Sequence, residues 1–259
     1  MREIFSDRIV IKVGTSTLTT ATGALNLQRI HELANVIAKL KNQEKQVILV
    51  TSGAIGVGTD RLNLAKRPTL IPEKQAVAAV GQSLLMGVYD KYFSTHGFAV
   101  GQVLITKDCI DHTRRYGNAI NTLNSLLNLG VIPIVNENDT VAVDEIVFGD
   151  NDTLSAYVAT MVNANLLIIL SDIDGLYDKN PSEPDAVLIS NVVKITDEIK
   201  ENAGDTKTAH GTGGMATKLE AATIAARNGT KTIIANGKDP AILERILDGE
   251  VVGTYFDLL

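Results

Sequence analysis

Short apolar runs alternate along the chain with longer segments of helical periodicity. The short runs are rich in β-branched residues and show no apolar-polar alternation, which is typical of strands buried on both faces of a sheet. They are "RIVIKVG", "KQVILVTSG", "FAVGQVLIT", "GVIPIVNEND", "NLLIILSD" and "TKTIIANG". Between them, apolar residues recur at helical spacing in segments 25–42, 73–96, 115–130, 152–165 and 215–229.

This order of strands and helices predicts an α/β fold, a three-layer αβα sandwich with a mostly parallel central sheet and helices on both faces. A chain of 259 residues without an internal repeat or a compositional boundary is expected to form a single domain. Segments 65–73 and 171–187 are rich in proline and charge, and either is expected to form a short hairpin or lid. Ligands of such sheets bind beyond the carboxyl ends of the strands.

Composition narrows the kinds of ligand. The chain has 30 acidic and 24 basic residues, a net charge of -6 and no dense run of lysine or arginine, which disfavours nucleic acid and anionic membranes and favours a small molecule. Cys109 is the only cysteine, and the first residues have no apolar signal core, so disulfides, zinc clusters and secretion are disfavoured. We expect a cytoplasmic protein, since the apolar runs are too short to span a bilayer.

Candidate anion-binding residues follow the first two apolar runs. Lys12 closes the first run and precedes Gly14, where it could meet an anion that approaches the backbone. Alternatively, it is a surface lysine at a strand end. In "TSGAIGVG", Ser52 and Gly53 predict a tight turn whose backbone N–H groups could hold an anion at a helix start, although these glycines could simply permit close helix packing.

Acidic and amide side chains cluster in "NENDTVAVDEIVFGDND". Such groups can bind an ammonium, pair with hydroxyls or organise a cation such as Mg²⁺. Asp150 or Asn151 could instead cap the helix expected to begin near Asp152. The cluster comprises Asn136, Glu137, Asn138, Asp139, Asp150, Asn151 and Asp152.

Two further motifs follow the later runs. In "SDIDGLYDKNP", Asp172 could neutralise or orient neighbouring lysines, whereas the segment lacks the spaced ligands of a calcium loop. In "GTGGMATK", glycines precede a helix whose first turn carries Lys218. Backbone amides, the helix dipole and the ammonium could all converge there on a phosphate, although the motif does not have the residue order of a P-loop and could alone be a flexible flap.

Taken together, "IVIKVGTSTLT", "VTSGAIGVG", "VNENDTV", "FGDNDTLSA", "SDIDGLY" and "GTGGMATKLEAA" resemble, in this order and over nearly the whole chain, the glutamate 5-kinases of the amino acid kinase superfamily. The resemblance implies the amino acid kinase fold, with an acceptor-substrate half at about 1–160 and a nucleotide half at about 161–259. It also implies ATP-dependent phosphorylation of the side-chain carboxylate of L-glutamate to L-glutamyl 5-phosphate, the first step of proline biosynthesis. The paired "NEND" and "GDND" segments resemble this family more than the acetylglutamate, aspartate, carbamate or uridylate kinases.

The resemblance implies residue roles as well. Lys12 and Lys218 would contact the transferring phosphoryl group, Asp172 would hold the two lysines in place, and Gly14 and Gly53 would offer backbone contacts. Mg²⁺ is an expected cofactor whose ligands stay unassigned. Glutamate-binding positions would be Ser52, Gly53, Asn136, Asp139 and Asn151, with Asp139 opposite the substrate ammonium. ATP-binding positions would be Lys12, Ser171, Asp172, Thr212, Gly213, Gly214, Met215, Ala216, Thr217 and Lys218.

Regulation and assembly are expected by the same resemblance. Proline is the expected feedback inhibitor, a homodimer or homotetramer the expected assembly, and a glutamyl phosphate reductase a functional partner. Many relatives carry a further C-terminal PUA domain, for which the chain leaves no room after "GTYFDLL", so we expect a short form. Proline is expected to act at segment 106–139, whose charges could alternatively be solvated helix-end groups: Lys107, Asp108, Asp111, Arg114 and Arg115. Rival functions are a kinase for another small acid and a catalytically silent ATP-binding regulator.

Overall fold

The computed structural model describes residues 1–20, 24–141, 151–204 and 214–258. The strands are β1 (Arg8–Val13), β2 (Gln46–Val50), β3 (Val100–Ile105), β4 (Ile132–Glu137), β5 (Leu166–Ser171), β6 (Asn191–Val192), β7 (Lys231–Asn236) and β8 (Thr254–Phe256). The helices are α1 (Thr15–Leu18), α2 (Leu27–Asn42), α3 (Ala54–Arg61), α4 (Ile71–Ser94), α5 (Lys107–Asp111), α6 (Thr113–Asn128), α7 (Asn151–Met161), α8 (Asp197–Gly204), α9 (Met215–Ala226) and α10 (Ile242–Leu247).

The strands form one sheet with the order β3-β4-β2-β1-β5-β7-β8-β6. All pairs are parallel except β7 with β8, so the predicted mostly parallel sheet is confirmed. Each apolar run named above contains one of the longer strands. The sequence pattern missed β6 and β8, which have two and three residues and are too short to show a periodicity.

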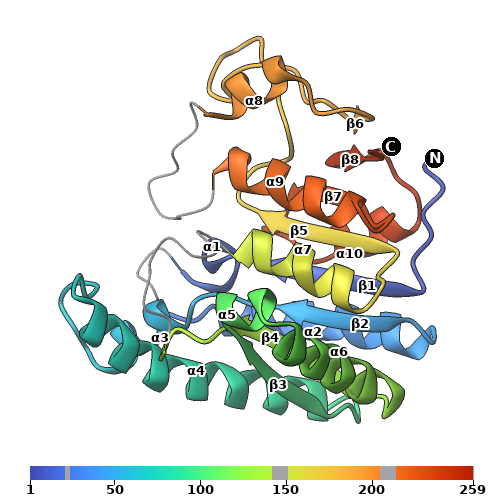
Figure 1. Ribbon diagram of the computed structural model, residues 1–259. Coiled ribbons are helices and arrows are strands. Elements are labelled where there is room, and N and C mark those ends of the chain that lie inside the picture. The colour runs from blue at the N-terminus through green and yellow to red at the C-terminus, as the bar shows by residue number, and fades with distance from the viewer. Residues whose placement is uncertain (21–23, 142–150, 205–213, 259) are drawn as a thin grey trace.

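Helices cover both faces of the sheet, as predicted (Figure 1). Val10 and Ile48 point into a core shared with α6, α7 and α9, whereas Ile9 and Leu49 point into a second core shared with α2, α4 and α10. Strand side chains alternate between faces, so a strand buried on both faces is apolar at every position. Among the described residues, no helix has the length and apolar character needed to cross a membrane.

The two irregular segments behave differently. Residues 171–187 contribute to a hairpin-like pairing in which Tyr177 bridges Leu188 in antiparallel fashion and Ile189 N–H donates to Leu176 at 2.8 Å. Residues 65–70 form no strand and lead into α4. The hairpin expectation is therefore confirmed for segment 171–187, and a lid role stays a prediction for both segments.

Glycines bring α3 and α4 into backbone contact. A Cβ at Gly81 would lie 1.8 Å from the carbonyl oxygen of Ala54, and one at Gly58 would lie 2.0 Å from that of Val77. Gly53 has a different role, because its φ of 102° places it in the left-handed region at the start of α3. The predicted tight turn is confirmed at Gly53 and the close helix packing at Gly58, while anion binding by this turn stays a prediction.

We predict that Gly81→Ala destabilises the protein by about 1–3 kcal/mol, because the new methyl group must push two helix backbones apart. Gly87→Ala on the same helix is the control, since a Cβ there meets nothing within 4 Å. That variant should gain about 0.5–1 kcal/mol from the better helix propensity of alanine. Urea denaturation of both variants measures the difference, and equal stabilities would contradict the packing argument.

Candidate active site

The candidate site lies at the carboxyl end of β1, in the middle of the sheet. β1 has β2 on one side and β5 on the other, so the chain order changes direction at this strand. Crevices at such switch points are the usual ligand sites of open α/β sheets. Lys12 is the fifth residue of β1 and is only 3% exposed, so it is not a surface lysine.

Asp152, in the first turn of α7, joins two lysines from distant parts of the chain. Its Oδ1 lies 2.6 Å from Lys12 Nζ, and its Oδ2 lies 3.0 Å from Lys218 Nζ in α9. Thr217 Oγ1 donates to the same Oδ2 at 3.2 Å. Asp152 is fully buried and Lys218 is 4% exposed. Buried charges are tolerated when they are paired in this way, and the carboxylate makes both ammonium groups converge on one point.

The contact that the sequence analysis assigned to Asp172 is therefore made by Asp152. Asp172 follows β5, is exposed and accepts a hydrogen bond from Ser171 Oγ at 3.1 Å. Asp152 makes this contact because α7 packs against β1 and its first turn lies next to Lys12. Asp172 lies beyond the carboxyl end of β5 and is exposed to solvent. An ATP-binding role for Asp172 and Ser171 stays a prediction.

A second cluster surrounds Asn151, the residue before Asp152. Asn151 Nδ2 lies 2.6 Å from the carbonyl oxygen of Thr51, 2.9 Å from Ser52 Oγ and 2.8 Å from Asn136 Oδ1. The Asn151 side chain thus donates to the ends of β2 and β4. The predicted residues Ser52, Asn136 and Asn151 are brought together, although no described side-chain contact links them to Asp139.

Two carboxylates lie at the end of β4, since Glu137 is its last residue and Asp139 follows two positions later. Burial, and secondarily the charge of Asp139, raises the pKa of Glu137 to about 7. Burial raises the pKa of Asp139 to about 6, against the opposite effect of the Arg67 guanidinium. Within the described part of the chain no ion pair joins either carboxylate to a lysine or arginine at 4 Å or less, and a bound ammonium group would stabilise their charged forms.

The glycine-rich motifs lie where a phosphate loop is expected. Gly14 precedes α1, and a Cβ there would lie 3.7 Å from Lys12 Nζ. Gly214 is the N-cap of α9 without a side-chain cap bond, followed by Met215, Ala216 and Thr217 in its first turn. The predicted residues Thr212 and Gly213, and Asp150 of the acidic cluster, lie outside the described residues.

Sequence reasoning missed Gln82 as a site residue, and it included Asp152 in the acidic cluster without assigning it to the two lysines. Asp152 was noticed only as one acid in a cluster, and its position at a helix start, where the dipole favours a carboxylate, was the available signal. Gln82 lies in the apolar pattern of α4 and accepts a hydrogen bond from Asn136 Nδ2 at 2.8 Å. A buried glutamine among small and aliphatic residues carried no recognisable motif.

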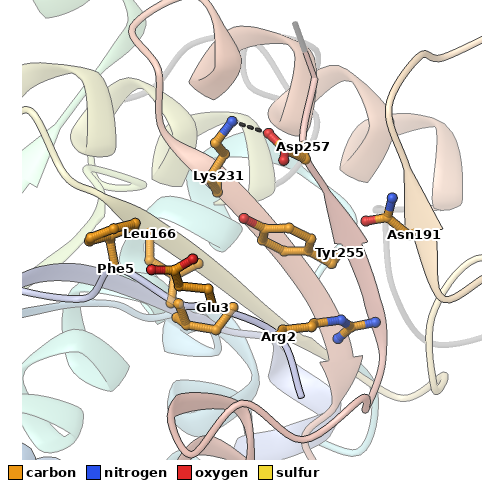
Figure 2. Close-up of a pocket in the computed structure, with 9 residues that line it drawn as sticks. Arg2, Glu3, Phe5, Leu166, Asn191, Lys231, Tyr255 and Asp257 are labelled. Atoms are coloured by element: carbon orange, nitrogen blue, oxygen red, sulfur yellow. Dashed lines mark hydrogen bonds and ion pairs between the residues drawn. The ribbon is translucent and has the colours of Figure 1, made fainter.

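A separate pocket of about 390 Å³ lies at the opposite ends of the strands (Figure 2). Leu166 and Lys231, the first residues of β5 and β7, contribute to its lining. Arg2 is bonded to the carbonyl oxygens of Val252 and Gly253 at 2.6 and 3.2 Å. Lys231 forms an ion pair with Asp257, drawn as the dashed line in Figure 2. The pocket contains none of the predicted site residues.

Two buried lysines and the start of α9 lie together at the carboxyl ends of the strands of a mostly parallel sheet. This arrangement is typical of enzymes that transfer a phosphoryl group. The family model described as the amino acid kinase family matches residues 7–236. Relatives named glutamate 5-kinase include those of Clostridium perfringens, 53% identical over 99% of this chain and 98% of theirs, and Listeria innocua, 56% identical over 97% and 93%. The chain therefore belongs to the amino acid kinase family and, within it, to the glutamate 5-kinases.

Solved structures agree on the fold. UMP kinase from Ureaplasma parvum matches with a TM-score of 0.66 at 14% identity, covering 98% of this chain and 99% of that one. Carbamate kinase from Giardia lamblia bound to AMP-PNP matches with a TM-score of 0.67 at 16% identity, with 98% and 99% covered. At such identities the likeness shows the shared fold alone.

The ion-pair cluster leads to a prediction that separates catalysis from stability. Lys218→Ala should lower kcat roughly 100- to 1000-fold, the usual effect of removing one preorganised charge from the transferring group, and leave glutamate binding largely intact. Asp152→Ala should instead lose about 3–5 kcal/mol of folding stability, because it strips the shared carboxylate from two buried lysines. Steady-state kinetics and urea denaturation measure both. Near-normal turnover by Lys218→Ala would remove this lysine from the catalytic set.

Proposed function

We propose that this chain transfers the γ-phosphoryl group of ATP to the side-chain carboxylate of L-glutamate, forming L-glutamyl 5-phosphate as the first step of proline biosynthesis. One observation carries the proposal most directly. Consecutive residues at the start of α7 serve the two halves of the site, since Asp152 contacts Lys12 and Lys218 while Asn151 contacts Ser52. A phosphate held by the lysines and an acceptor held beside Ser52 would meet at this helix start.

The chemistry needs positioning more than proton transfer. A glutamate side chain has an ordinary pKa of about 4.3 and is ionised at neutral pH, so the nucleophile requires no general base. The obstacle is repulsion between an anionic acceptor and a polyanionic donor. Preorganised cations and helix N-termini reduce it and stabilise charge that moves to the leaving oxygen.

Each group around the expected position of the transferring phosphoryl group contributes to this task. Lys12 and Lys218 neutralise the transferring phosphoryl group, and the backbone N–H groups at Gly214 and Met215 point along the start of α9, where a helix favours anions. Asp152 keeps the lysines at a fixed separation. Ser171 and Asp172 line the nucleotide side in this proposal.

Mg²⁺ is proposed to bind together with ATP. The described part of the chain holds no group of three or more His, Cys, Asp or Glu side chains suited to a metal. Mg²⁺ often keeps several waters and binds through substrate phosphates with one or two carboxylates, and Asp172, an exposed carboxylate after β5, could be such a ligand. The ion would neutralise phosphate charge.

The acceptor half recognises glutamate through groups of fixed polarity. The Asp139 carboxylate accepts from the substrate ammonium. Ser52 Oγ accepts a hydrogen bond from Asn151 Nδ2, and its own hydrogen can therefore be donated to a substrate carboxylate. The Asn151 Nδ2 group is engaged by the protein, so its Oδ1 is the atom that can face a substrate donor.

The decisive experiment measures ADP release against a panel of acceptors: L-glutamate, N-acetyl-L-glutamate, L-aspartate, carbamate and UMP. We expect turnover with L-glutamate to exceed that with every other compound. Faster turnover with another acceptor would establish a kinase for a different small acid. Binding of ATP without turnover of any acceptor would establish a nucleotide-binding regulator.

Acidification should weaken glutamate recognition. Asp139 must be charged to attract the ammonium, so kcat/KM for glutamate should fall as the pH drops through about 6, the raised pKa of this carboxyl group. Arg67→Ala should move the fall to higher pH, because it removes the positive charge that lowers that pKa. The pH profile of kcat/KM for both proteins tests this. An Arg67→Ala profile that superimposes on the wild-type profile would contradict the electrostatic link.

Feedback and assembly belong to the same proposal. Proline shares the α-carboxylate and amino group of glutamate, so it would compete in the acceptor half and raise the KM for glutamate more than that for ATP. Segment 106–139 ends in the proposed acceptor positions Asn136 and Asp139 and contains an ion pair between Asp108 and Arg115. A cytoplasmic homo-oligomer that passes its reactive acyl phosphate to a reductase completes the proposal.

A further inference from the structure

Helix α4 supports the acceptor half with two buried polar side chains. Gln82 is 7% exposed and Tyr89 is fully buried, and seven residues, about two helical turns, place both on one face. Gln82 Oε1 accepts from Asn136 Nδ2 at 2.8 Å. The Tyr89 hydroxyl lies 2.7 Å from Thr51 Oγ1. The helix thus contacts the ends of β4 and β2, which carry two members of the acceptor cluster formed by Ser52, Asn136 and Asn151.

Backbone geometry fixes the direction of the first contact. Asn136 Oδ1 accepts from Glu137 N–H at 2.9 Å, and a backbone N–H can only donate. The other side-chain atom of Asn136 is therefore its NH₂ group, which must donate to Gln82. Gln82 accordingly presents its carbonyl oxygen to Asn136.

This direction propagates to Asn151. Asn136 Oδ1, oriented in this way, also accepts from Asn151 Nδ2 at 2.8 Å. Thr51, supported by Tyr89, offers its carbonyl oxygen to the same Nδ2 at 2.6 Å. Two of the acceptors around Asn151 Nδ2 therefore belong to residues held by α4, and these contacts leave Asn151 Oδ1 for a ligand.

The other end of Gln82 indicates that folding alone does not explain this side chain. Gln82 Nε2 is fully buried and has no hydrogen-bond partner among the described residues. A buried donor without a partner lowers stability, and an apolar side chain of similar size would avoid that loss. Stability therefore argues against glutamine here, whereas the contact of its Oε1 with Asn136 argues for it.

We propose that Gln82 is a positioning residue for the acceptor substrate, which acts by orienting Asn136 and, through it, Asn151. Tyr89 is the second support, at Thr51. This inference rests on the proposed function for the identity of the acceptor, L-glutamate. It goes beyond that function because it places two residues that determine the affinity for the acceptor on α4.

The experiment compares Gln82→Leu with Gln82→Glu. Leucine removes the acceptor for Asn136, so the KM for glutamate should rise about tenfold, the effect of one hydrogen bond, while the KM for ATP changes less than about twofold. Urea denaturation should show Gln82→Leu to be close to wild type in stability, because removal of the unpartnered Nε2 donor offsets the loss of the acceptor for the buried Asn136 Nδ2. Glutamate at position 82 is similar in size and retains an oxygen for Asn136, and burial favours its neutral form, so it should restore most of the affinity.

Controls separate positioning from packing. Leu85→Val alters the same helix in its apolar core and should lower stability without raising the KM for glutamate. Tyr89→Phe, which removes only a hydroxyl, should raise that KM, and it supplies a second test if Gln82→Leu does not fold. An unchanged KM in both Gln82→Leu and Tyr89→Phe would overturn the inference, as would a parallel rise in the KM for ATP. A Gln82→Glu variant no better than Gln82→Leu would overturn it too, and would indicate that Nε2 is the important atom.

A readout independent of turnover completes the test. The side-chain amide resonances of Asn136 and Asn151 should shift or broaden in Gln82→Leu and return toward their wild-type positions in Gln82→Glu. If the wild type releases no ADP with glutamate, the proposed function fails, and the amide spectra still decide for or against the role of Gln82. Unshifted resonances in Gln82→Leu would refute it.

Discussion

The site depends on a single buried carboxylate. Asp152 is fully buried and pairs with Lys12 and Lys218, which arrive from the first strand and from α9, more than two hundred residues along the chain. Neither lysine could remain charged at such low exposure without a counter-charge, because transfer of an isolated ion into the interior is very unfavourable. The pairing therefore fixes the starts of α7 and α9 next to the end of β1. Two ammonium groups are thereby held close together, where both could contact one anionic group of a ligand.

The neighbouring residue, Asn151, makes the same helix start serve the acceptor. Its amide nitrogen donates to Thr51, Ser52 and Asn136, so the ends of β2 and β4 are tied to the residue next to the lysine-binding carboxylate. An α-helix fixes adjacent residues rigidly, and the separation between the two half-sites therefore does not depend on a loop. Phosphoryl transfer gains most from such fixed positioning.

Much of the fold was predictable because its strands are long and buried on both faces. Val10 and Ile11 point to opposite cores. A strand buried on both faces is an uninterrupted apolar run, which can be recognised from a single sequence. β8 has three residues and exists only through its pairing with β7, which no local pattern records. For the site, Lys12, Lys218, Ser52, Asn136 and Asn151 were predicted and are placed at the expected strand and helix ends. The sequence predicts Asp172 as the carboxylate between the two lysines, but Asp152 makes these contacts. A sequence shows which acidic residues end a strand or begin a helix, whereas packing decides which of them is buried.

Gln82 and the Asp152 ion-pair cluster share a physical property, since each places polar or charged groups in the interior at a cost in stability. Gln82 buries a donor without a partner, and Asp152 brings three charged side chains out of water. Close packing of Gly58 and Gly81 and the two apolar cores offset these losses and keep α3 and α4 rigid beneath the acceptor cluster. A sequence pattern shows the apolar residues that stabilise the fold, because they recur at regular spacing along a strand or helix. A polar residue that binds or positions a ligand occurs singly within such a pattern. Its role is recognised only when the structure shows which atoms it contacts.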